Sequence, residues 1–165
     1  MNHPAPSISV VMTTFNKASY LERTLASWTH QTASGYELVI IDDGSTDDTP
    51  AVVERYASRL PISYHRIENA GRGPARNHGL ERARGEIIAF SDDDRLVSAG
   101  FIQAYQQELA SGANVVALGW QHRLVVELRP HEPIAASHLF KILDARPEVK
   151  RAIEHGATLV HGGTR

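Results

Sequence analysis

Cysteine is the first residue type that this chain of 165 residues lacks. Its absence excludes disulfide bonds, thiolate catalysis and cysteine-ligated metal centres, and it fits a reducing compartment. The chain also lacks an excess of charge of one sign, because 17 Lys and Arg stand against 19 Asp and Glu, for a formal net charge of -2 at pH 7. This balance gives no electrostatic basis for binding nucleic acid or an anionic membrane surface.

Long apolar runs are missing as well. No run reaches the roughly 20 residues that a membrane-spanning helix needs. The start, Met1-Asn2-His3-Pro4, has no basic region followed by an apolar one, so we expect no signal peptide. Nine histidines are many for this length, but no pair has the HExxH spacing of a zinc hydrolase. With 42% hydrophobic and 22% charged residues, the composition is that of a globular domain with a proper core.

Apolar segments of two different periods alternate along the first two thirds of the chain. Runs rich in β-branched residues predict strands over residues 7–14, 36–42, 62–67 and 87–90. Apolar residues at helical spacing predict helices over residues 17–31, 47–60, 74–84 and 98–109, and two more strands are expected at 115–118 and 124–128. Repeated strand–helix alternation predicts an α/β fold with a mainly parallel central sheet flanked by helices in three layers.

Local signals add detail to these boundaries. Thr46 or Asp47 is expected to be the N-cap of the second helix. Gly85 is expected to close the third helix as a C-cap. The apolar run that ends at Phe90 is expected to be a buried strand.

Polar residues follow three of the predicted strands, and these clusters should converge because the carboxyl ends of parallel strands meet at one edge of a sheet. Three adjacent carboxylates repel one another, and a divalent cation is the simplest means of neutralising them. Mg²⁺ and Mn²⁺ are often held by one or two carboxylates together with substrate phosphates. A solvated acidic turn is the alternative for the triplet taken alone. The clusters are Thr13-Thr14-Phe15-Asn16, Asp42-Asp43-Gly44-Ser45 and Asp92-Asp93-Asp94.

Taken together, the motifs resemble those of the family 2 glycosyltransferases, which are inverting nucleotide-sugar enzymes with the GT-A fold. The resemblance covers about residues 6–120. It implies one GT-A-like domain over residues 1–165, with a nucleotide-sugar-binding part at 6–120 and the start of an acceptor region, expected to be incomplete, at 121–165. The matching stretches stand in the family's order and spacing: residues 10–17, 37–47, 75–79 and 85–86, the last leading to the acidic triplet.

The resemblance implies a nucleoside-binding set at the ends of the first two strands. Thr13 and Asp43 would contact the nucleobase and the ribose, since a carboxylate can accept the imide N–H of uracil. Phe15 and Asn16 complete this part of the expected substrate site. Strand-end packing is the alternative role for Thr13, and building a turn and capping the next helix is the alternative for Asp43.

The resemblance also implies a phosphate- and metal-binding set. Asp94 would be the direct metal ligand and Asp92 a weaker ligand, with Asp93 facing the ribose. Arg72 would pair with the pyrophosphate, assisted by a helix N-terminus. Arg76 belongs to the expected substrate site, and an ion pair that holds its helix to the acidic loop is an equal alternative for it.

The reaction implied by the resemblance is metal-dependent sugar transfer with inversion. The donor would be a nucleoside-diphosphate sugar, with a UDP-sugar favoured, and the acceptor a saccharide, a lipid or another hydroxyl compound. Mg²⁺ or Mn²⁺ is the implied cofactor, and no nucleic acid is expected as a partner. Many family members build surface polysaccharides or glycolipids, which implies a cytoplasmic location with peripheral association at the inner membrane face.

The general base that inversion requires is not identified in the sequence. A non-catalytic nucleotide-sugar-binding domain therefore stays open as an alternative function. A sugar-phosphate nucleotidyltransferase is less favoured, because its Gly-Gly-x-Gly-Thr-Arg loop is absent after the first strand, and a dehydrogenase of the Rossmann type would need GxGxxG there. The acids after Glu108, none in a context typical of the family's base, are Glu127, Glu132, Asp144, Glu148 and Glu154.

Overall fold

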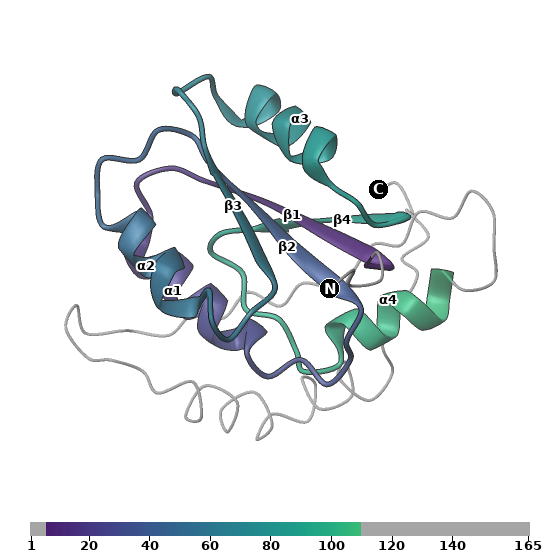
Figure 1. The fold of residues 1–165 in the computed structure, drawn as a ribbon. Coiled ribbons are helices and arrows are strands. Elements are labelled where there is room, and N and C mark those ends of the chain that lie inside the picture. Colours follow the sequence, from purple (N-terminus) through teal and green to yellow (C-terminus); the bar gives the residue numbers. More distant parts are fainter. Residues whose placement is uncertain (1–5, 110–165) are drawn as a thin grey trace, which may run out of the picture. The chain divides into compact units, whose positions relative to one another are not determined.

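Four parallel strands carry the fold in the computed structural model, which describes residues 6–109 (Figure 1). They form one sheet in the order β3-β2-β1-β4. The predicted parallel sheet is thereby confirmed, whereas the strands expected at 115–118 and 124–128 lie outside the described residues. The strands are β1 (Ile8–Thr14), β2 (Tyr36–Asp42), β3 (Ile62–Arg66) and β4 (Ile87–Asp92).

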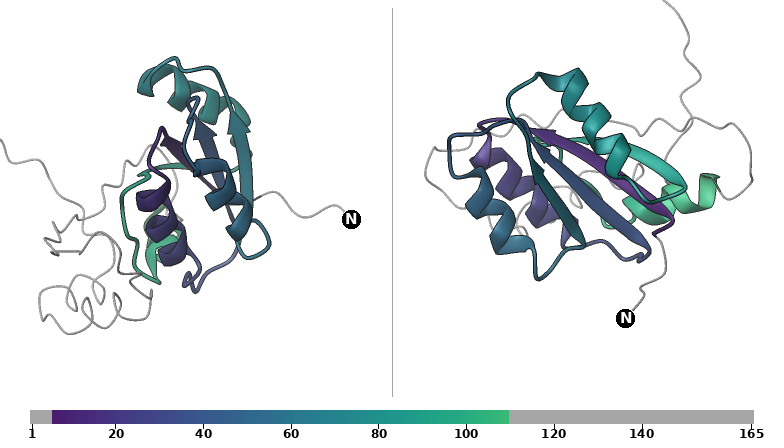
Figure 2. Two further views of the ribbon diagram at one scale, coloured as in Figure 1. Left: turned by 90° about the vertical axis from the view of Figure 1, so that its left-hand side faces the viewer. Right: turned by 45° about the horizontal axis from the view of Figure 1, so that its top comes forward.

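Helices cover both faces of this sheet. Helix α3 lies on one face, and α1 and α2 lie on the other (Figures 1 and 2). The chain divides into two units, Met1–Ile102 and Gln103–Arg165, and these layers belong to the first unit. None of the helices within residues 6–109 combines the length and apolar character needed to cross a bilayer. The helices are α1 (Ala18–Trp28), α2 (Thr49–Tyr56), α3 (Arg72–Arg82) and α4 (Phe101–Leu109).

The core lies on either side of the two central strands, β1 and β2. On one face Val11, Val39 and Ile41 pack with Ala75 of α3. On the other face the sheet meets fully buried side chains of α1 such as Leu25. Successive residues of a strand point to opposite faces of the sheet, and this alternation continues to the residues that end each strand. A residue that lies two positions after an α3-facing residue therefore also faces α3, and the residue next to it in the sequence faces α1.

The chain changes direction in the sheet between β1 and β4. From β1 it runs outward through β2 to β3, and it then returns to place β4 on the other side of β1. Thr13 lies beside Asp92 of β4 on one side and beside Ile41 of β2 on the other. In open parallel sheets, ligands bind beyond the carboxyl ends of the strands at such a switch point.

Strand β4 corrects one prediction. It is not buried throughout, because Ile88 is 37% and Phe90 is 52% exposed. Both residues pair with β1 on the face that α3 covers, opposite Ser9 and Val11 respectively. Helix α3, however, packs over β1 and β2. An apolar run shows that a strand belongs in a sheet, but it does not show which of its side chains a helix covers.

Gly85 corrects a second prediction. Helix α3 ends before it, with Ala83 as the C-cap residue. A Cβ atom at Gly85 would lie 2.5 Å from the backbone nitrogen of Ser9 and 2.7 Å from the carbonyl carbon of Ile8. The glycine is therefore required by the close approach of this segment to β1, and not by the helix end.

Asp47 has a wider role than the predicted N-cap. Helix α2 begins after Asp48, so neither Thr46 nor Asp47 is its N-cap residue. Instead, Asp47 Oδ1 accepts the backbone N–H of Thr49 at 3.0 Å, and Oδ2 accepts the N–H of Ala18, at the start of α1, at 2.9 Å. Burial alone would raise the pKa of this carboxyl, but the hydrogen bond from the Thr49 hydroxyl, at 2.6 Å, and these backbone N–H bonds outweigh it and lower the pKa. One carboxylate thus fixes the starts of two helices.

Candidate functional site

The ends of β1 and β2 are tied together at the switch point. Asn16, which follows β1, has a positive φ of 51°, a conformation that asparagine tolerates better than most residues. Its backbone N–H donates to Ser45 Oγ at 3.0 Å, and its Oδ1 accepts the N–H of Thr46 at 2.7 Å. Phe15 beside it is 45% exposed. The predicted convergence of the first two polar strand ends is confirmed, with Asn16 as the link between them.

Asp43 anchors the loop that leads from β3 into α3. Its side-chain Oδ1 accepts the N–H of Ala70 at 2.8 Å, and Oδ2 accepts the N–H of Gly71 at 2.9 Å. Its backbone carbonyl oxygen accepts a hydrogen bond from the side-chain amide of Asn69. Asp43 is therefore bound to the α3 loop and not to the start of α2. Each carboxylate oxygen retains a lone pair that a ligand could use.

Asp42 is turned to the opposite face and is structural. It is fully buried, and Ser45 N–H donates to its Oδ1 at 2.7 Å while the Tyr64 hydroxyl donates to its Oδ2 at 2.5 Å. Burial and the bond to Asp42 raise the pKa of Tyr64. The side-chain partners of Asp42 belong to the turn and to β3, so this carboxylate holds the fold together at the end of β2.

Helix α3 brings two arginines toward the same edge. Its N-cap residue, Gly71, supplies no side-chain cap. Arg72 is exposed and has no ion pair or side-chain hydrogen bond with any residue in the range 6–109. Arg76, one turn later, places its Nη2 atom 3.4 Å from Asp92 Oδ1. The ion pair considered as the alternative for Arg76 is therefore present, while Arg72 is available to a ligand.

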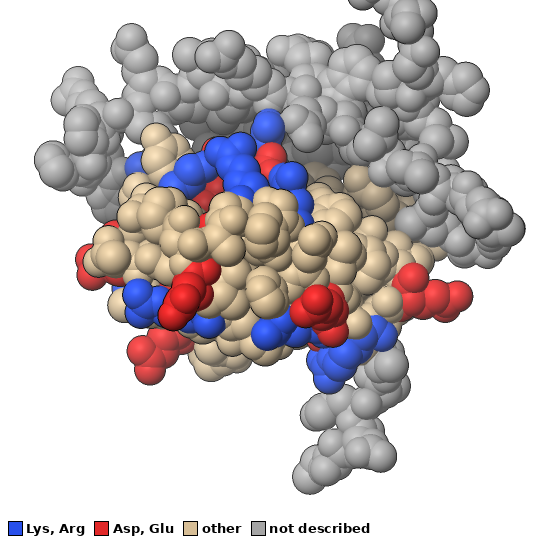
Figure 3. Space-filling model, turned by 90° about the horizontal axis from the view of Figure 1, so that it is seen from above, with Lys and Arg blue, Asp and Glu red and all other residues tan. Residues whose placement is uncertain are grey.

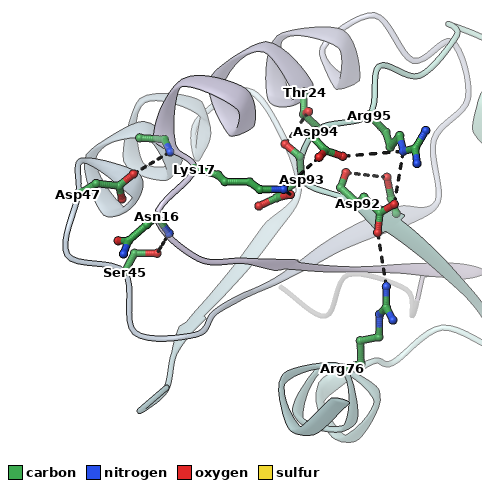
Figure 4. A network of polar contacts seen from close by, with 12 residues as sticks. Asn16, Lys17, Thr24, Ser45, Asp47, Arg76, Asp92, Asp93, Asp94 and Arg95 are labelled. Carbon is green, nitrogen blue, oxygen red and sulfur yellow. Dashed lines mark hydrogen bonds and ion pairs between the residues drawn. The ribbon is translucent and has the colours of Figure 1, made fainter. Parts of the chain in front are cut away.

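The acidic triplet is held by cations of the protein itself (Figure 4). Lys17 Nζ lies 3.1 Å from Asp93 Oδ1 and 3.0 Å from Asp94 Oδ2. Arg95 Nε lies 3.4 Å from Asp92 Oδ2 and 3.8 Å from Asp94 Oδ1. The hydrogen bond to Asp94 is the main cause that raises the pKa of Lys17, and burial opposes it, so the ammonium form is favoured.

Asp93 differs from its two neighbours in burial. Its side chain is 6% exposed, against 45% for Asp92 and 39% for Asp94. Its carbonyl oxygen accepts the hydroxyl of Thr24 on α1 at 2.9 Å. Asp93 is therefore packed beneath the start of α1, next to Lys17, and its contact with a ribose stays a prediction.

The charges at this edge balance without any metal ion. Lys17, Arg76 and Arg95 match the three carboxylates, so repulsion within the triplet does not by itself demand a divalent cation in this arrangement. The donor set nonetheless fits a hard cation, because Asp92 and Asp94 each turn an oxygen toward the same nitrogen, Arg95 Nε. Within residues 6–109 no three acidic or histidine side chains form a metal cluster, so further ligands would come from a substrate or from residues outside that range.

Lys17 and Arg95 were missed by the sequence reasoning. Each directly follows a predicted site residue, Asn16 in one case and Asp94 in the other, and that adjacency is the signal that could have drawn attention to them. Seen from above, basic side chains gather at one edge of the described surface with acidic atoms among them, and smaller basic and acidic groups adjoin one another elsewhere (Figure 3).

Comparison with known proteins places the chain in a family. Residues 9–163 match the model of Glycosyl transferase family 2. The chain belongs to this family. Its parallel sheet with flanking helices is the GT-A fold of the solved glycosyltransferase structures that it resembles.

Two of those solved structures contain nucleotide sugars. The structure of S. aureus TarS residues 1–349 in complex with UDP-GlcNAc superposes with a TM-score of 0.61 at 29% identity, over 64% of this chain and 31% of that one. The mannosyltransferase PcManGT from Pyrobaculum calidifontis, in complex with GDP-Man and Mn²⁺, gives a TM-score of 0.57 at 30% identity, over 62% and 32% of the two chains.

A curated relative of known name is also similar in sequence. Validoxylamine A glucosyltransferase of Streptomyces hygroscopicus subsp. jinggangensis is 36% identical over 146 residues, which cover 78% of this chain and 35% of the relative. The chain thus spans about a third of the length of this relative and of the two solved proteins.

Proposed function

We propose that this chain binds a nucleoside-diphosphate sugar at the carboxyl ends of β1, β2 and β4 and transfers the sugar to an acceptor hydroxyl with inversion. The observation that carries the proposal is the meeting of polar groups from three strand ends and from the start of α3 at the switch point of the sheet. The solved relatives support it, since one holds UDP-GlcNAc and another holds GDP-Man with Mn²⁺. A UDP-sugar is the favoured donor.

The nucleoside would lie against Thr13 and Asp43. Asp43 is suited to this role because two backbone N–H bonds fix its carboxylate, so that its remaining lone pairs are presented in a set direction. Phe15 and Asn16 would border the nucleoside at the end of β1. The phosphates would face Arg72, whose guanidinium is free among the described residues, and the uncapped start of α3.

Asp94 and Asp92 would hold the divalent cation, Mg²⁺ or Mn²⁺. When bound, such an ion would stabilise the negative charge that develops on the departing nucleoside diphosphate. Asp93 would contribute from the α1 side, toward the ribose. Lys17 would keep Asp93 and Asp94 in place for these contacts.

Non-catalytic binding of a nucleotide sugar is a second candidate function, and one observation favours it. Inversion requires a general base, yet the site carboxylates Asp43, Asp92, Asp93 and Asp94 are all engaged with backbone N–H groups or with cations. We assign no base among residues 6–109.

The acceptor, a saccharide, a lipid or another hydroxyl compound, would be bound by residues 121–165, and a place at the inner membrane face belongs to the same proposal.

Calorimetric titration with UDP, with and without Mn²⁺, tests the donor site. We expect Mn²⁺-dependent UDP binding that GDP and ADP displace poorly. Asp94→Asn should weaken the Mn²⁺-dependent UDP binding by at least about 10-fold, because a loss of this size is seen even when a group that only hydrogen-bonds to a metal ligand is removed. Asp48→Asn is the matched control, because Asp48 is an exposed aspartate at the start of α2 whose side chain makes no cap hydrogen bond.

Two outcomes would count against the proposal. If the folded protein bound no nucleotide, both candidate functions would be wrong. If it bound UDP-sugars but transferred sugar to no acceptor hydroxyl, the non-catalytic function would replace the enzymatic one.

A further inference from the structure

Asp94 has a protein cation at each of its two carboxylate oxygens. Lys17 Nζ lies 3.0 Å from Oδ2, and Arg95 Nε lies 3.8 Å from Oδ1. The same Arg95 nitrogen lies 3.4 Å from Asp92 Oδ2. Arg95 Nε therefore contacts both carboxylates that would hold the divalent cation of the proposed function, as Figure 4 shows. A metal ion that coordinated Asp92 Oδ2 and Asp94 Oδ1 would therefore compete with the guanidinium for these oxygens.

The two cations on Asp94 are not held equally. Lys17 makes the shorter contacts, and it also pairs with Asp93, whose side chain is 6% exposed. Removing Lys17 would leave this buried carboxylate without its counter-charge, which is strongly unfavourable. Arg95 makes the longer contacts, and 46% of its side chain is exposed, so it loses little on moving away. Of the two, Arg95 is the cation that can leave.

The diphosphate of a bound donor would offer Arg95 another partner. A planar guanidinium pairs with phosphate oxygens as well as with carboxylates. It would also be repelled by a divalent cation at the same carboxylates. Binding of the nucleotide would then be coupled to the release of Asp92 and Asp94 from Arg95. Such coupling acts equally in both directions, so release of the two carboxylates would also favour nucleotide binding.

We propose that Arg95 occupies the cation position between Asp92 and Asp94 in the nucleotide-free protein and moves to the donor phosphates when the nucleotide binds. The metal ion and the nucleotide therefore bind cooperatively. This inference rests on the proposed donor site and assigns a gating role to a residue that directly follows the acidic triplet.

The test measures Mn²⁺ affinity by the electron paramagnetic resonance signal of free Mn²⁺, with and without saturating UDP. In the wild-type protein we expect UDP to tighten Mn²⁺ binding about 10-fold or more, which lies within the usual range of coupling between sites. Arg95→Gln should bind Mn²⁺ several-fold more tightly than wild type when UDP is absent. Its gain in Mn²⁺ affinity on adding UDP should be correspondingly smaller.

Two further variants distinguish the specific contact of Arg95 with both carboxylates from a general effect of removing a positive charge. Arg76→Gln removes the same charge, but Arg76 contacts only Asp92 among the three acids, at 3.4 Å. Its effect on Mn²⁺ affinity without UDP should be clearly smaller than that of Arg95→Gln. Arg55→Gln breaks an ion pair with Glu22, which joins α1 and α2, and should behave as wild type. Circular dichroism would establish that each variant is folded.

The outcomes distinguish this inference from the proposed function. If wild type binds UDP and Mn²⁺ cooperatively but Arg95→Gln shows the same Mn²⁺ affinity and the same coupling, the gating role is wrong and the donor site stands. An Arg76→Gln effect as large as that of Arg95→Gln would likewise overturn it. If wild type binds neither UDP nor Mn²⁺, the proposed function fails and the inference fails with it.

Discussion

Glu37 shows at the scale of single residues how this fold keeps a buried charge away from its candidate site. The side chain is 4% exposed, near the start of β2. Its Oε1 accepts the Ser9 hydroxyl at 2.6 Å, and its Oε2 receives two nitrogens of the Arg84 guanidinium at 2.6 and 2.9 Å. Burial alone would raise the pKa of Glu37, but the hydrogen bonds from Arg84 and Ser9 outweigh it, so the pKa is lowered.

This lowered pKa predicts a dependence of stability on pH. A carboxyl whose pKa is lower in the folded state contributes stability above its unfolded pKa, and it loses that contribution as the pH falls through the folded value. Glu37→Gln should therefore destabilise the protein by about 1–3 kcal/mol at pH 7. The difference from wild type should shrink as the pH falls below 4.5, the ordinary value for this group. Urea unfolding at several pH values measures it.

Glu54→Gln is the matched control for this measurement. Glu54 is exposed on α2, and its substitution should change the free energy of unfolding by less than about 0.5 kcal/mol at every pH. A Glu37→Gln difference that stayed constant from pH 7 to pH 3 would contradict the role assigned to the ionised carboxylate.

The ion pairs of Lys17 and Arg95 are the contacts at the residue scale that the sequence did not predict. The triplet Asp92-Asp93-Asp94 was located from its place after an apolar run. Its partner Lys17, however, stands 76 and 77 positions away from the acids that it contacts. Only the parallel pairing of β1 with β4 brings them together. Neighbours in the sequence alone therefore did not reveal that cations of the protein also balance the charge of the triplet.

At the scale of elements, α3 depends on one close contact with the sheet. A Cβ atom at Gly79 would lie 2.3 Å from Val11 Cγ1 and 3.4 Å from Ile41 Cγ1. Both valine and isoleucine are β-branched and fully buried here, so they cannot turn aside easily. Gly79→Ala should therefore destabilise the protein by about 1–3 kcal/mol through overpacking, measured by chemical unfolding.

Gly73 provides an internal control on the same helix. Nothing lies within 4 Å of a Cβ atom built there. Gly73→Ala should leave stability unchanged or raise it by about 0.5–1 kcal/mol, because alanine loses less backbone freedom than glycine in a helix. Equal destabilisation by both substitutions would contradict the overpacking argument, because it would show that any glycine replacement in α3 lowers stability, whatever its distance from the sheet.

Periodicity explains why the elements themselves were predicted well. The sequence predicts β2 at residues 36–42, as observed, because both faces of this strand are buried and its apolar run is continuous. The sequence predicts the start of α3 two residues late, because Pro74 is typical of a first helical turn, whereas Arg72 already begins the helix. The exposure of Phe90 was not predictable, since the position of α3 over β1 and β2 is a property of packing between elements.

At the scale of the whole molecule, the proposed donor site exists only in the folded chain. Asp43 reaches it from β2, Arg72 from α3 and Asp94 from beyond β4, and the parallel sheet is what brings these segments to one edge. In the unfolded chain the same groups are far apart. A ligand that binds this edge must therefore stabilise the native state relative to the unfolded state.

The expected size of that stabilisation follows from mass action. UDP with Mn²⁺ at 100 times its dissociation constant should raise the free energy of unfolding by about 2.7 kcal/mol, seen as a higher urea midpoint with an unchanged slope. Asp48→Asn should show the same increase at the same ligand concentrations, and Asp94→Asn should lose the part that depends on Mn²⁺. Stabilisation by Mn²⁺ and UDP that was equal in Asp94→Asn and wild type would place the ligand elsewhere on the molecule, because a site at the end of β4 requires that carboxylate.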